Sequence, residues 1–472
     1  MAQAIHPSPC HQFDSLRHQL GERQGLPFLK LLSRDLVEQA CRLYNHPWRE
    51  RLYTPWITLG IFLSQVLSDD HSCDDAVERF QKFRYDRGLP AVAPETSSYC
   101  EARQRLPEEL IWDLVRRTGQ AIHRQAEDAW LFHGRSVQVI DGSTVTMPDT
   151  PENQAAYPQL DSQAPGAGFP IARLLVVFSL AVGTVLQAAL GPYQGKQTSE
   201  LALLRQILDH FRPGDIVLAD RFYCSYWTIA ALQARGVEVV VRLHQARQAD
   251  FRRGRRLGRE DHLVTWTKPL HVPGWMSRAE YEAMPARIAV RELRVRVRDR
   301  SKRVRDLVIV TTLVDAATYR ADELRGLFRQ RWHAELDLRT LKTEMRMEML
   351  RTKSPAMVRK EVAVHLLAYN LIRGIMAEAA RVVEVKPRRL SFTGALHTVR
   401  SFEEGHLYDR ARIEADLPRL LELIGQKRVG ERPDRYEPRA VKRRPKPYPR
   451  LTVPRKAAKR LIKRGIRLYE KV

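Results

Sequence analysis

The amino-acid sequence predicts an α/β fold in which a mixed sheet follows a helical N-terminal domain. Apolar residues recur at helical spacing in the first part of the chain, and short segments typical of strands begin near residue 136. The chain has 472 residues and 44% hydrophobic content, which is enough for two or three domains with real cores. We predict a helical domain over 1–130, an α/β domain over 131–385 and a helical, basic tail over 386–472.

Four segments of the first part carry apolar residues at helical spacing and are separated by prolines. They are LPFLKLLSRDLVEQACRLY (26–44), WITLGIFLSQVLSDD (56–70), DDAVERFQKFR (74–84) and EELIWDLVRRTGQAIHRQ (108–125). Such a helical domain can dock on DNA or can serve only for packing. The number of helices does not separate these two interpretations.

The second part begins with three consecutive strand patterns, after which strands alternate with helices. The strands are SVQVIDGSTVTM (136–147), ARLLVVFSLAV (172–182), GTVLQAALG (183–191), DIVLAD (215–220) and VEVVVRL (237–243). Helices are predicted over 199–210 and 225–235. The order of three strands, helix, strand, helix and strand is compatible with a ribonuclease H-like core, in which helices cover a mixed sheet.

A β-strand insertion is predicted at about 244–306, before the next helix of that core. Its most regular segment, IAVRELRVRVRDRSKRVRDLVIVTTL (288–313), alternates apolar and basic residues. One face of a strand can then be buried while the other presents a row of arginines. A long helix carrying Glu335 follows, and further helices are predicted from Pro355 to about Ala380.

The charge of the chain points to a polyanionic partner. The formal net charge is +24 with a pI of about 10.1, and from Lys427 onward eighteen Lys or Arg residues stand against four acidic ones. Such a field concentrates phosphate backbones, so nucleic acid is the first candidate and an anionic membrane surface the second. The strongest apolar run, Leu174 to Leu186, is shorter than the roughly 20 residues of a spanning helix. Because the N-terminus lacks a secretory pattern, we expect a cytoplasmic location.

Charged residues lie on the apolar face of the predicted helix around Glu335. At about 100° per residue, one stripe holds Phe328, Arg331, Glu335 and Lys342. The same side carries Leu324, Leu338 and Met349, and the opposite side, where solvated charge is expected, carries Asp337, Glu344 and Glu348. A carboxylate on an apolar face needs a partner. An Arg331–Glu335 ion pair and a metal ion are equally good interpretations.

Two aspartates occur in the strand patterns of the sheet. Asp141 could form an Asp-Gly hairpin turn, and Asp220 could cap a helix, although Ser225 is the better cap for the helix that follows. On the proposed sheet, Asp141 lies on the first strand, Asp220 at the end of the fourth, and Glu335 on the helix after the fifth. The three carboxylates then meet at one edge. Such oxygen ligands suit two Mg²⁺ or Mn²⁺ ions, which roughly 4 Å apart can support phosphodiester cleavage.

Other chemistries fit the sequence less well. GPYQGKQTS (191–199) resembles a phosphate-binding loop, but its glycines are too close together and Gln197 stands where Ser or Thr must bind Mg²⁺. The sequence has neither an HExxH pair nor a GxSxG nucleophile motif. His333, two positions before Glu335, is expected at the surface. The five cysteines show no paired spacing for a zinc site or a disulfide framework.

The spacing Phe328-x2-Arg331-x3-Glu335-x6-Lys342 resembles the Y-x2-R-x3-E-x6-K signature of bacterial insertion-sequence transposases with a DDE triad, the insertion-sequence-four family. VIDGSTV (139–145) and VLADRFY (217–223) resemble the two aspartate motifs of that family. The likeness extends from about Ser136 to Asn370. SSYCEARQRLP (97–107) and PRAVKRRPKPYPRL (438–451) are also similar to family segments.

The resemblance implies a DNA transposase in which Asp141, Asp220 and Glu335 bind two Mg²⁺ or Mn²⁺ ions and are catalytic. The candidates for DNA contact are Arg331, Lys342, Arg221 and Phe328. Phe328 stands in place of the tyrosine of the family, so a hydroxyl that could bond a phosphate is absent, although the ring can still pack. The implied partners are the terminal inverted repeats and the target DNA, held by a homodimer that assembles on DNA in the bacterial cytoplasm.

The resemblance also implies cut-and-paste chemistry that passes through a DNA hairpin. In the family, an aromatic side chain of the β insertion can hold a base flipped from the hairpin end. Trp266 or Trp275 could serve, but a buried tryptophan in a small β domain is the simpler explanation for each. Two alternative functions are a catalytically degenerate DNA-binding protein or repressor, and a ribonuclease H-like nuclease without strand transfer.

Overall fold

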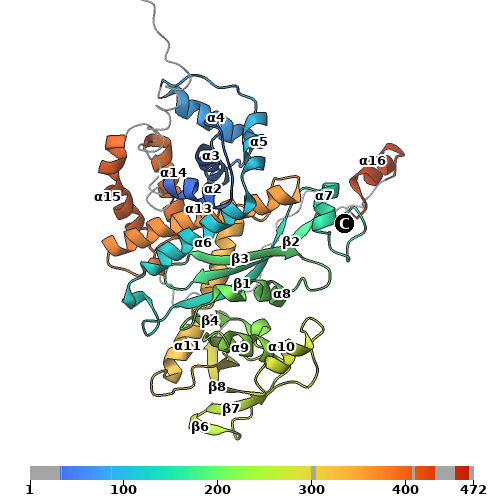
Figure 1. Ribbon diagram of the computed structural model, residues 1–472, viewed down its shortest axis with the longest axis vertical. Coiled ribbons are helices and arrows are strands. Elements are labelled where there is room, and N and C mark those ends of the chain that lie inside the picture. The colour runs from blue at the N-terminus through green and yellow to red at the C-terminus, as the bar shows by residue number, and fades with distance from the viewer. Residues whose placement is uncertain are drawn as a thin grey trace, which may run out of the picture.

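The computed structural model describes residues 32, 34–86, 88–298, 304–406, 410–430 and 452–466. The start of the first predicted helix and the basic segment 438–451 lie outside these residues. The described chain forms a nine-stranded sheet with helices packed on it and a helical N-terminal region beside it (Figure 1). The predicted α/β fold with a mixed sheet and a helical N-terminal region is therefore confirmed.

The N-terminal region contains five helices in its described residues. They are α2 (Arg34–Leu43), α3 (Pro55–Leu67), α4 (Cys73–Tyr85), α5 (Ser97–Arg105) and α6 (Glu108–Arg124). The start of α3 follows from its sequence, because the Thr54 side chain accepts a hydrogen bond from the Ile57 amide and Pro55 occupies the first turn. Helix α5 was not predicted, since its nine residues are too few to reveal a clear period.

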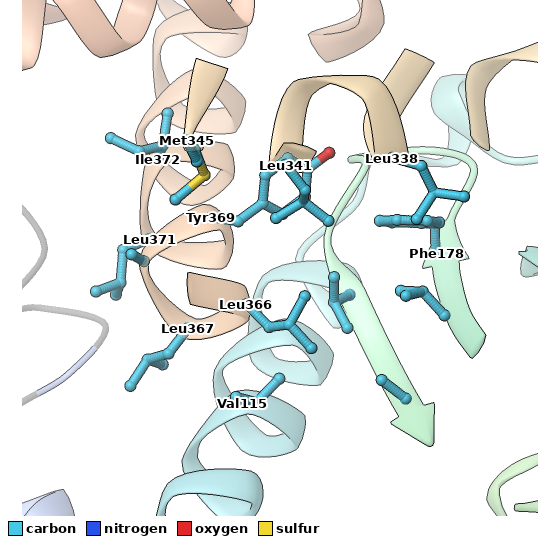
Figure 2. Close-up of a cluster of buried hydrophobic side chains, with 14 of the residues drawn as sticks. Val115, Phe178, Leu338, Leu341, Met345, Leu366, Leu367, Tyr369, Leu371 and Ile372 are labelled. Carbon is cyan, nitrogen blue, oxygen red and sulfur yellow. The ribbon is translucent and has the colours of Figure 1, made fainter. Parts of the chain in front are cut away.

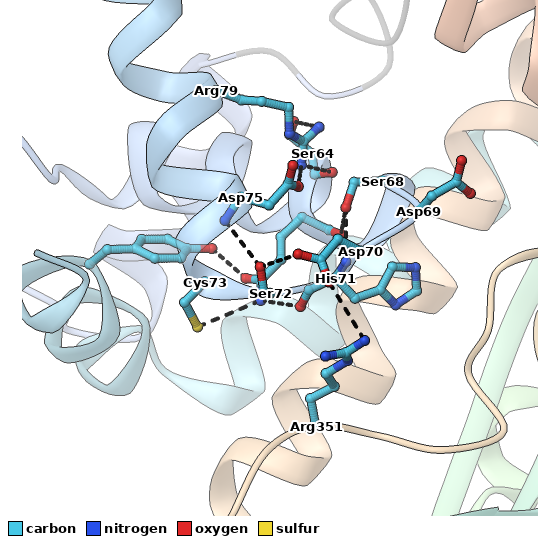
Figure 3. Close-up of polar contacts among 12 residues, drawn as sticks. Ser64, Ser68, Asp69, Asp70, His71, Ser72, Cys73, Asp75, Arg79 and Arg351 are labelled. Carbon is cyan, nitrogen blue, oxygen red and sulfur yellow. Dashed lines mark hydrogen bonds and ion pairs between the residues drawn. The ribbon is translucent and has the colours of Figure 1, made fainter. Parts of the chain in front are cut away.

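Polar side chains fix the turn between α3 and α4 (Figure 3). The Ser68 hydroxyl accepts a hydrogen bond from the His71 amide at 3.0 Å, and the Ser72 hydroxyl caps α4 by accepting from the Asp75 amide at 3.0 Å. Arg351, far along the chain, forms an ion pair with Asp70 at 3.8 Å. The turn is thereby joined to the α/β part of the molecule.

The sheet is mixed, with the strand order β3-β2-β1-β4-β5-β9-β8-β7-β6. Its strands are β1 (Val137–Thr146), β2 (Ile171–Ser179), β3 (Val185–Pro192), β4 (Ile216–Ala219), β5 (Glu238–Arg242), β6 (Arg255–Gly258), β7 (Asp261–Thr267), β8 (Arg287–Arg298) and β9 (Val304–Thr311). The central strands β1, β4 and β5 are parallel, and all other neighbours are antiparallel. Asp141 lies on the first strand as predicted, and the alternative of an Asp-Gly turn does not form, because Asp141 and Gly142 lie inside β1, opposite Val176 and Leu175.

Strands of the predicted β insertion continue the same sheet, because β9 pairs with β5. The predicted row of arginines on one exposed face is wrong at Arg291, whose side chain is buried. Its guanidinium pairs with the buried carboxylate of Asp261 on β7, with an N–O distance of 2.6 Å. A strand pattern identifies which residues alternate, but it does not reveal that an acid on a neighbouring strand allows an arginine to be buried.

Helices cover both faces of the sheet. Helices α8 (Glu200–Gln206) and α9 (Tyr226–Gln233) lie on one face and share its core with Ile140, Val217 and Val239. Ser199 and Ser225 cap these two helices. The opposite face packs against α13 (Pro355–Val382), whose buried side chains meet those of α6 and β2 (Figure 2). Because α13 also contacts α3, it joins the N-terminal helices to the sheet.

The long helix predicted around Glu335 is interrupted. Helix α11 (Ala321–Arg329) ends before α12 (Trp332–Arg339), which continues as the π-helical turn η5 (Thr340–Glu344). A helical wheel drawn across these breaks misplaces two residues. Met349 lies beyond the helix and is exposed, and Asp337 is buried rather than solvated.

The remaining helical elements are short or C-terminal. They are η2 (Asp128–Trp130), α7 (Pro151–Ala156), η3 (Leu208–His210), η4 (Arg221–Tyr223), α10 (Arg278–Ala283), η6 (Pro387–Arg389), α14 (Phe392–His406), α15 (Arg410–Gln426) and α16 (Arg455–Lys463). None of the described helices is long and apolar enough to cross a membrane.

Candidate active site

The two predicted aspartates lie on β1 and directly after β4, which is its parallel neighbour. In the register of β1 and β4, Val139 is opposite Leu218. Asp141 follows two residues later on β1, and Asp220 follows two residues later, just past the end of β4, so an extension of the same register would set them side by side. Parallel strands are about 4.8 Å apart. Strand pairing therefore brings these two residues close together in space, although they are far apart in the sequence.

Side-chain alternation points both aspartates to the same face of the sheet. Val139 on β1 and Leu218 on β4 belong to the core shared with α12 and α13, whereas Ile140 and Ala219 belong to the core shared with α8 and α9. Because side chains alternate along a strand, Asp141 and Asp220 continue the series that faces α12. The burial of the neighbouring apolar side chains thus determines the face of the sheet to which the two aspartates point.

Glu335 reaches this place from the helix that packs over β1. Ala334 and Leu338 bury one side of α12 in the core, and α12 contacts β1 directly. The Glu335 side chain retains 36% of its exposure and pairs with the guanidinium of Arg331 at 2.5 Å. The helical i,i+4 pair considered for this segment is therefore present, and it lies beside Asp141.

The electrostatic surroundings of Asp141 join these groups into one site. Burial raises the pKa of the Asp141 carboxyl to about 6. The Gly142 amide, which donates a hydrogen bond to it at 2.9 Å, and Arg331 lower this pKa, whereas the carboxylates of Glu335 and Glu200 raise it. The pKa of Tyr223 is raised mainly by burial, and also by Glu200, Asp141 and Asp220. These groups therefore lie in one neighbourhood around Asp141 and Tyr223.

The carboxylates fit a divalent cation by their chemistry. In the described part of the chain, no three His, Cys, Asp or Glu side chains gather closely enough to enclose a metal ion. One acid of the predicted triad, Glu335, instead faces Arg331. Carboxylate oxygens are nevertheless the ligands preferred by Mg²⁺. Asp141 is a partly buried acid with the carboxylates of Glu335 and Glu200 near it. A bound cation stabilises the charged form of such an acid.

Asp220 also has a local structural role. Its carboxylate accepts a hydrogen bond from the Arg221 amide at 2.6 Å and caps the short 3-10 helix η4. The sequence suggested that a capping role was weak because the next α-helix begins at Ser225. The intervening 3-10 turn is too short to give a sequence pattern.

The four candidates for DNA contact differ in their surroundings. Arg221 is exposed on η4, next to Asp220. Arg331 is mostly buried against Glu335, and Lys342 on η5 pairs with Glu348 at 3.6 Å. Phe328 is only 7% exposed and packs in the core with Leu324.

The two tryptophans of the predicted β insertion are both engaged by protein groups. Trp266 on β7 is buried, donates a hydrogen bond to Glu292 at 3.0 Å and is covered by Arg247, 4.0 Å from the ring centre. Trp275 is partly exposed, and Arg205 stacks on it at 4.0 Å. The buried position of Trp266 agrees with the simpler of the two explanations for that residue.

Sequence reasoning missed Glu200 and Tyr223 near this site and misjudged Asp337 and His333. Glu200 and Tyr223 lie on the face of the sheet that α8 covers. Asp337 is buried and anchors α12 through its ion pairs. Glu200 follows a helix-capping serine and therefore looked like an ordinary first-turn acid. His333 was expected at the surface, but it is partly buried and burial lowers its pKa to about 4.

Comparisons with known proteins cover the same part of the chain. The family model described as a transposase DDE domain matches residues 132–371, which is just over half of the chain and includes all three carboxylates. The chain is also similar to the transposase InsG for insertion sequence element IS4 from Escherichia coli (strain K12). The two are 29% identical over 458 residues, which cover 94% of this chain and 97% of that relative.

Proposed function

The chain belongs to the family of transposases with a DDE domain, and from this premise we propose that it moves an insertion sequence by cut and paste, with Asp141, Asp220 and Glu335 as its metal-binding catalytic residues. Transposition of DNA by a DDE enzyme agrees with both comparisons. The details of ion, residues and steps are our proposal. The observation that carries it is the parallel register of β1 and β4, which brings Asp141 near the end of β4, where Asp220 follows, with Glu335 on the helix that packs over β1.

The proposed cofactor is a pair of Mg²⁺ or Mn²⁺ ions held by these carboxylates. When bound, the ions would activate the attacking oxygen and stabilise the leaving oxygen of a phosphodiester. Asp141 and Asp220 would contribute oxygens from the sheet, and Glu335 would contribute one from α12. For this, Glu335 has to exchange its contact with Arg331 for a cation. The freed Arg331 guanidinium could then bind a phosphate, which is a geometry that arginine favours.

The sheet order supports a ribonuclease H-like core. Strands β3, β2 and β1 are antiparallel neighbours, and β4 and β5 extend the sheet in parallel from β1. This matches the arrangement proposed from the order of three strands, helix, strand, helix and strand. The 1–130, 131–385 and 386–472 division, with an insertion at about 244–306, is our proposal for the domains. The continuous core across α3, α13 and the sheet means that the first two parts pack tightly.

The proposed partners are the terminal inverted repeats of the element and the target DNA. Arg221, Arg331 and Lys342 would contact phosphates near the cleaved bond, and the net charge of +24 would provide affinity that does not depend on sequence. Two ends have to be brought together, so we propose a homodimer assembled on DNA. The DNA substrate assigns the reaction to the bacterial cytoplasm and its nucleoid. After hydrolysis of one strand, the freed 3′ hydroxyl would attack the phosphodiester of the opposite strand, which would form a hairpin and release the flanking DNA. Hydrolysis of the hairpin would restore the 3′ hydroxyl, which would then attack a phosphodiester of the target DNA.

The test is end cleavage by Asp141→Ala, Asp220→Ala and Glu335→Ala variants in Mg²⁺ or Mn²⁺. We expect each variant to retain binding of DNA that carries the element ends while cleavage falls by several orders of magnitude. Glu152→Ala is a matched control, because this acid is exposed in the first turn of α7. Cleavage at the normal rate by Asp141→Ala would remove Asp141 from the mechanism. Binding without cleavage by the unaltered chain would instead favour the degenerate DNA-binding protein, and cleavage without joining would favour the nuclease.

A further inference from the structure

Glu200 lies on the reverse face of the sheet from the proposed catalytic carboxylates. It is the first residue of α8, whose apolar side chains belong to the core shared with Ile140 and Val217. Its carboxylate makes three contacts, with Tyr223, Arg173 and the backbone at Gly142. These four residues, which we term the Glu200 cluster, belong to α8, η4, β2 and β1.

The hydrogen bond between Tyr223 and Glu200 connects α8 to the second aspartate motif. The Tyr223 hydroxyl donates to the Glu200 carboxylate at 2.9 Å, and the tyrosine side chain is buried. Tyr223 is the last residue of η4, and its amide donates a hydrogen bond to the carbonyl of Asp220 at 3.1 Å. A hydrogen bond to an ionised acceptor in a buried place is among the stronger contacts of a protein. Through Tyr223, these two hydrogen bonds restrain Asp220 from the face of the sheet that α8 covers.

The contact at Gly142 connects α8 to the first aspartate motif. A Cβ atom at this position would lie 2.3 Å from the Glu200 carboxyl carbon, so no side chain larger than that of glycine fits without displacing the acid. Gly142 directly follows Asp141 and donates its amide to the Asp141 carboxylate. The absence of a side chain thus allows Glu200 to lie against β1 at the residue next to the catalytic aspartate.

Arg173 completes the cluster and provides the opposite charge. Its guanidinium is 3.3 Å from the Glu200 carboxylate and stacks over the Tyr193 ring, 4.3 Å from its centre. Arg173 on β2 is paired with Thr144 of β1 and Gly191 of β3. The charge of Glu200 is therefore balanced by Arg173 within the cluster.

We propose that Glu200 is a positioning residue of the active site, which holds Gly142 and Tyr223 together and so keeps Asp141 and Asp220 side by side. This role rests on the proposed catalytic function of the two aspartates. Contacts behind a metal ligand commonly change metal affinity by roughly 10- to 100-fold, because an unrestrained ligand has to be ordered when the ion binds. Glu200 acts on the ion through the backbone of the two aspartate segments and does not bind it.

The first experiment measures restraint without any metal. Amide hydrogen exchange of the full chain in a chelating buffer reports local opening of residues 140–142 and 220–224. Glu200→Ala and Tyr223→Phe should each raise exchange in these segments by roughly tenfold or more, and the double variant should add little, since both remove the same contact. Glu152→Ala is the matched control, because Glu152 is an exposed acid in the first turn of the comparably short helix α7. Unchanged exchange in Glu200→Ala would overturn the proposal.

The second experiment separates positioning from direct attraction of the cation. Calorimetric titration of the full chain with Mn²⁺ should give a dissociation constant roughly tenfold or more weaker for Glu200→Ala and Tyr223→Phe. Glu200→Gln retains an oxygen that accepts from Tyr223, so its affinity should stay within about threefold of the unaltered chain. A loss in Glu200→Gln as large as in Glu200→Ala would mean that the charge of Glu200 attracts the ion, which contradicts positioning. Asp141→Ala tests the proposed function separately, because only that function requires Mn²⁺ binding to be lost there.

Discussion

The carboxylate of Asp337 pairs with the guanidinium of Arg373 at 2.5 Å, and both side chains are almost completely buried. The second carboxylate oxygen pairs with Arg388 at 2.6 Å. Asp337 lies on α12, two residues after Glu335, whereas Arg373 lies on α13 and Arg388 on η6. The helix that carries the third acid of the proposed triad is therefore anchored by charge pairs to two other elements.

Asp337→Asn should lower the stability of the protein strongly, because two buried guanidinium groups lose the negative charge that balances them. Breaking a buried pair commonly costs about 3–5 kcal/mol. The measurement is urea unfolding followed by circular dichroism. Glu348→Gln is the control, since Glu348 is exposed and forms only a 3.6 Å pair with Lys342, and we expect a change within about 0.5 kcal/mol. Equal effects of the two substitutions would contradict the anchoring role.

Asp337 also illustrates where sequence reasoning stops. The helical period placed it opposite the apolar stripe and therefore in solvent. Its partners are 36 and 51 residues away in the sequence, and a local pattern contains no information about them. The breaks between α11, α12 and η5 add a second error, because a period of 3.6 residues holds only within one continuous helix. Met349 was placed in the apolar stripe for that reason.

Asp141 and Asp220 were easier to place from the sequence. Each follows a short apolar run that is recognisable as a strand, and the strand patterns of β1 and β4 were predicted with nearly the observed bounds. Their approach depends on the parallel register of β1 and β4, and the order of the elements was compatible with that topology. Glu200 had no such signal, because its importance arises from Tyr223 and Gly142, which meet it only in the folded sheet.

Asp141→Asn should stabilise the metal-free protein above about pH 6. The folded-state pKa of Asp141 is about 6, against an ordinary value of 3.8, so the folded protein holds this proton more tightly than the unfolded chain. Stability is therefore lost as the pH rises from about 4 to 6 and stays lower above it. The variant lacks this cost, and we expect a gain of about 1–3 kcal/mol at pH 8 and none at pH 4. Thermal unfolding in a chelating buffer measures it, and a gain that is equal at both pH values would contradict the assignment.

Phe328→Ala should reduce stability while leaving DNA binding intact below the melting temperature. The ring is 7% exposed in the main core, and truncation of a buried phenylalanine costs about 3–5 kcal/mol. Trp332→Ala is the control, because this neighbouring aromatic side chain is 49% exposed and should cost less than about 1 kcal/mol. Thermal unfolding and a DNA-binding titration are measured on both variants. Weakened DNA binding by Phe328→Ala at unchanged stability would instead indicate that the ring contacts DNA.

Removal of residues 431–472 should weaken DNA binding and make it less dependent on salt. The removed segment contains sixteen Lys or Arg residues and four acidic ones. Truncation after Gly430 keeps Arg428, which bridges to Leu390, so the folded core loses no described strand contact. Each lost phosphate contact should reduce the slope of log affinity against log salt concentration by about 0.9. A chain in which a Gly/Ser-rich segment of equal length replaces the tail controls for length, and it should behave like the truncated chain. If the slope of the truncated chain equals that of the intact chain, the tail does not bind phosphates, and the affinity must come from the folded surface.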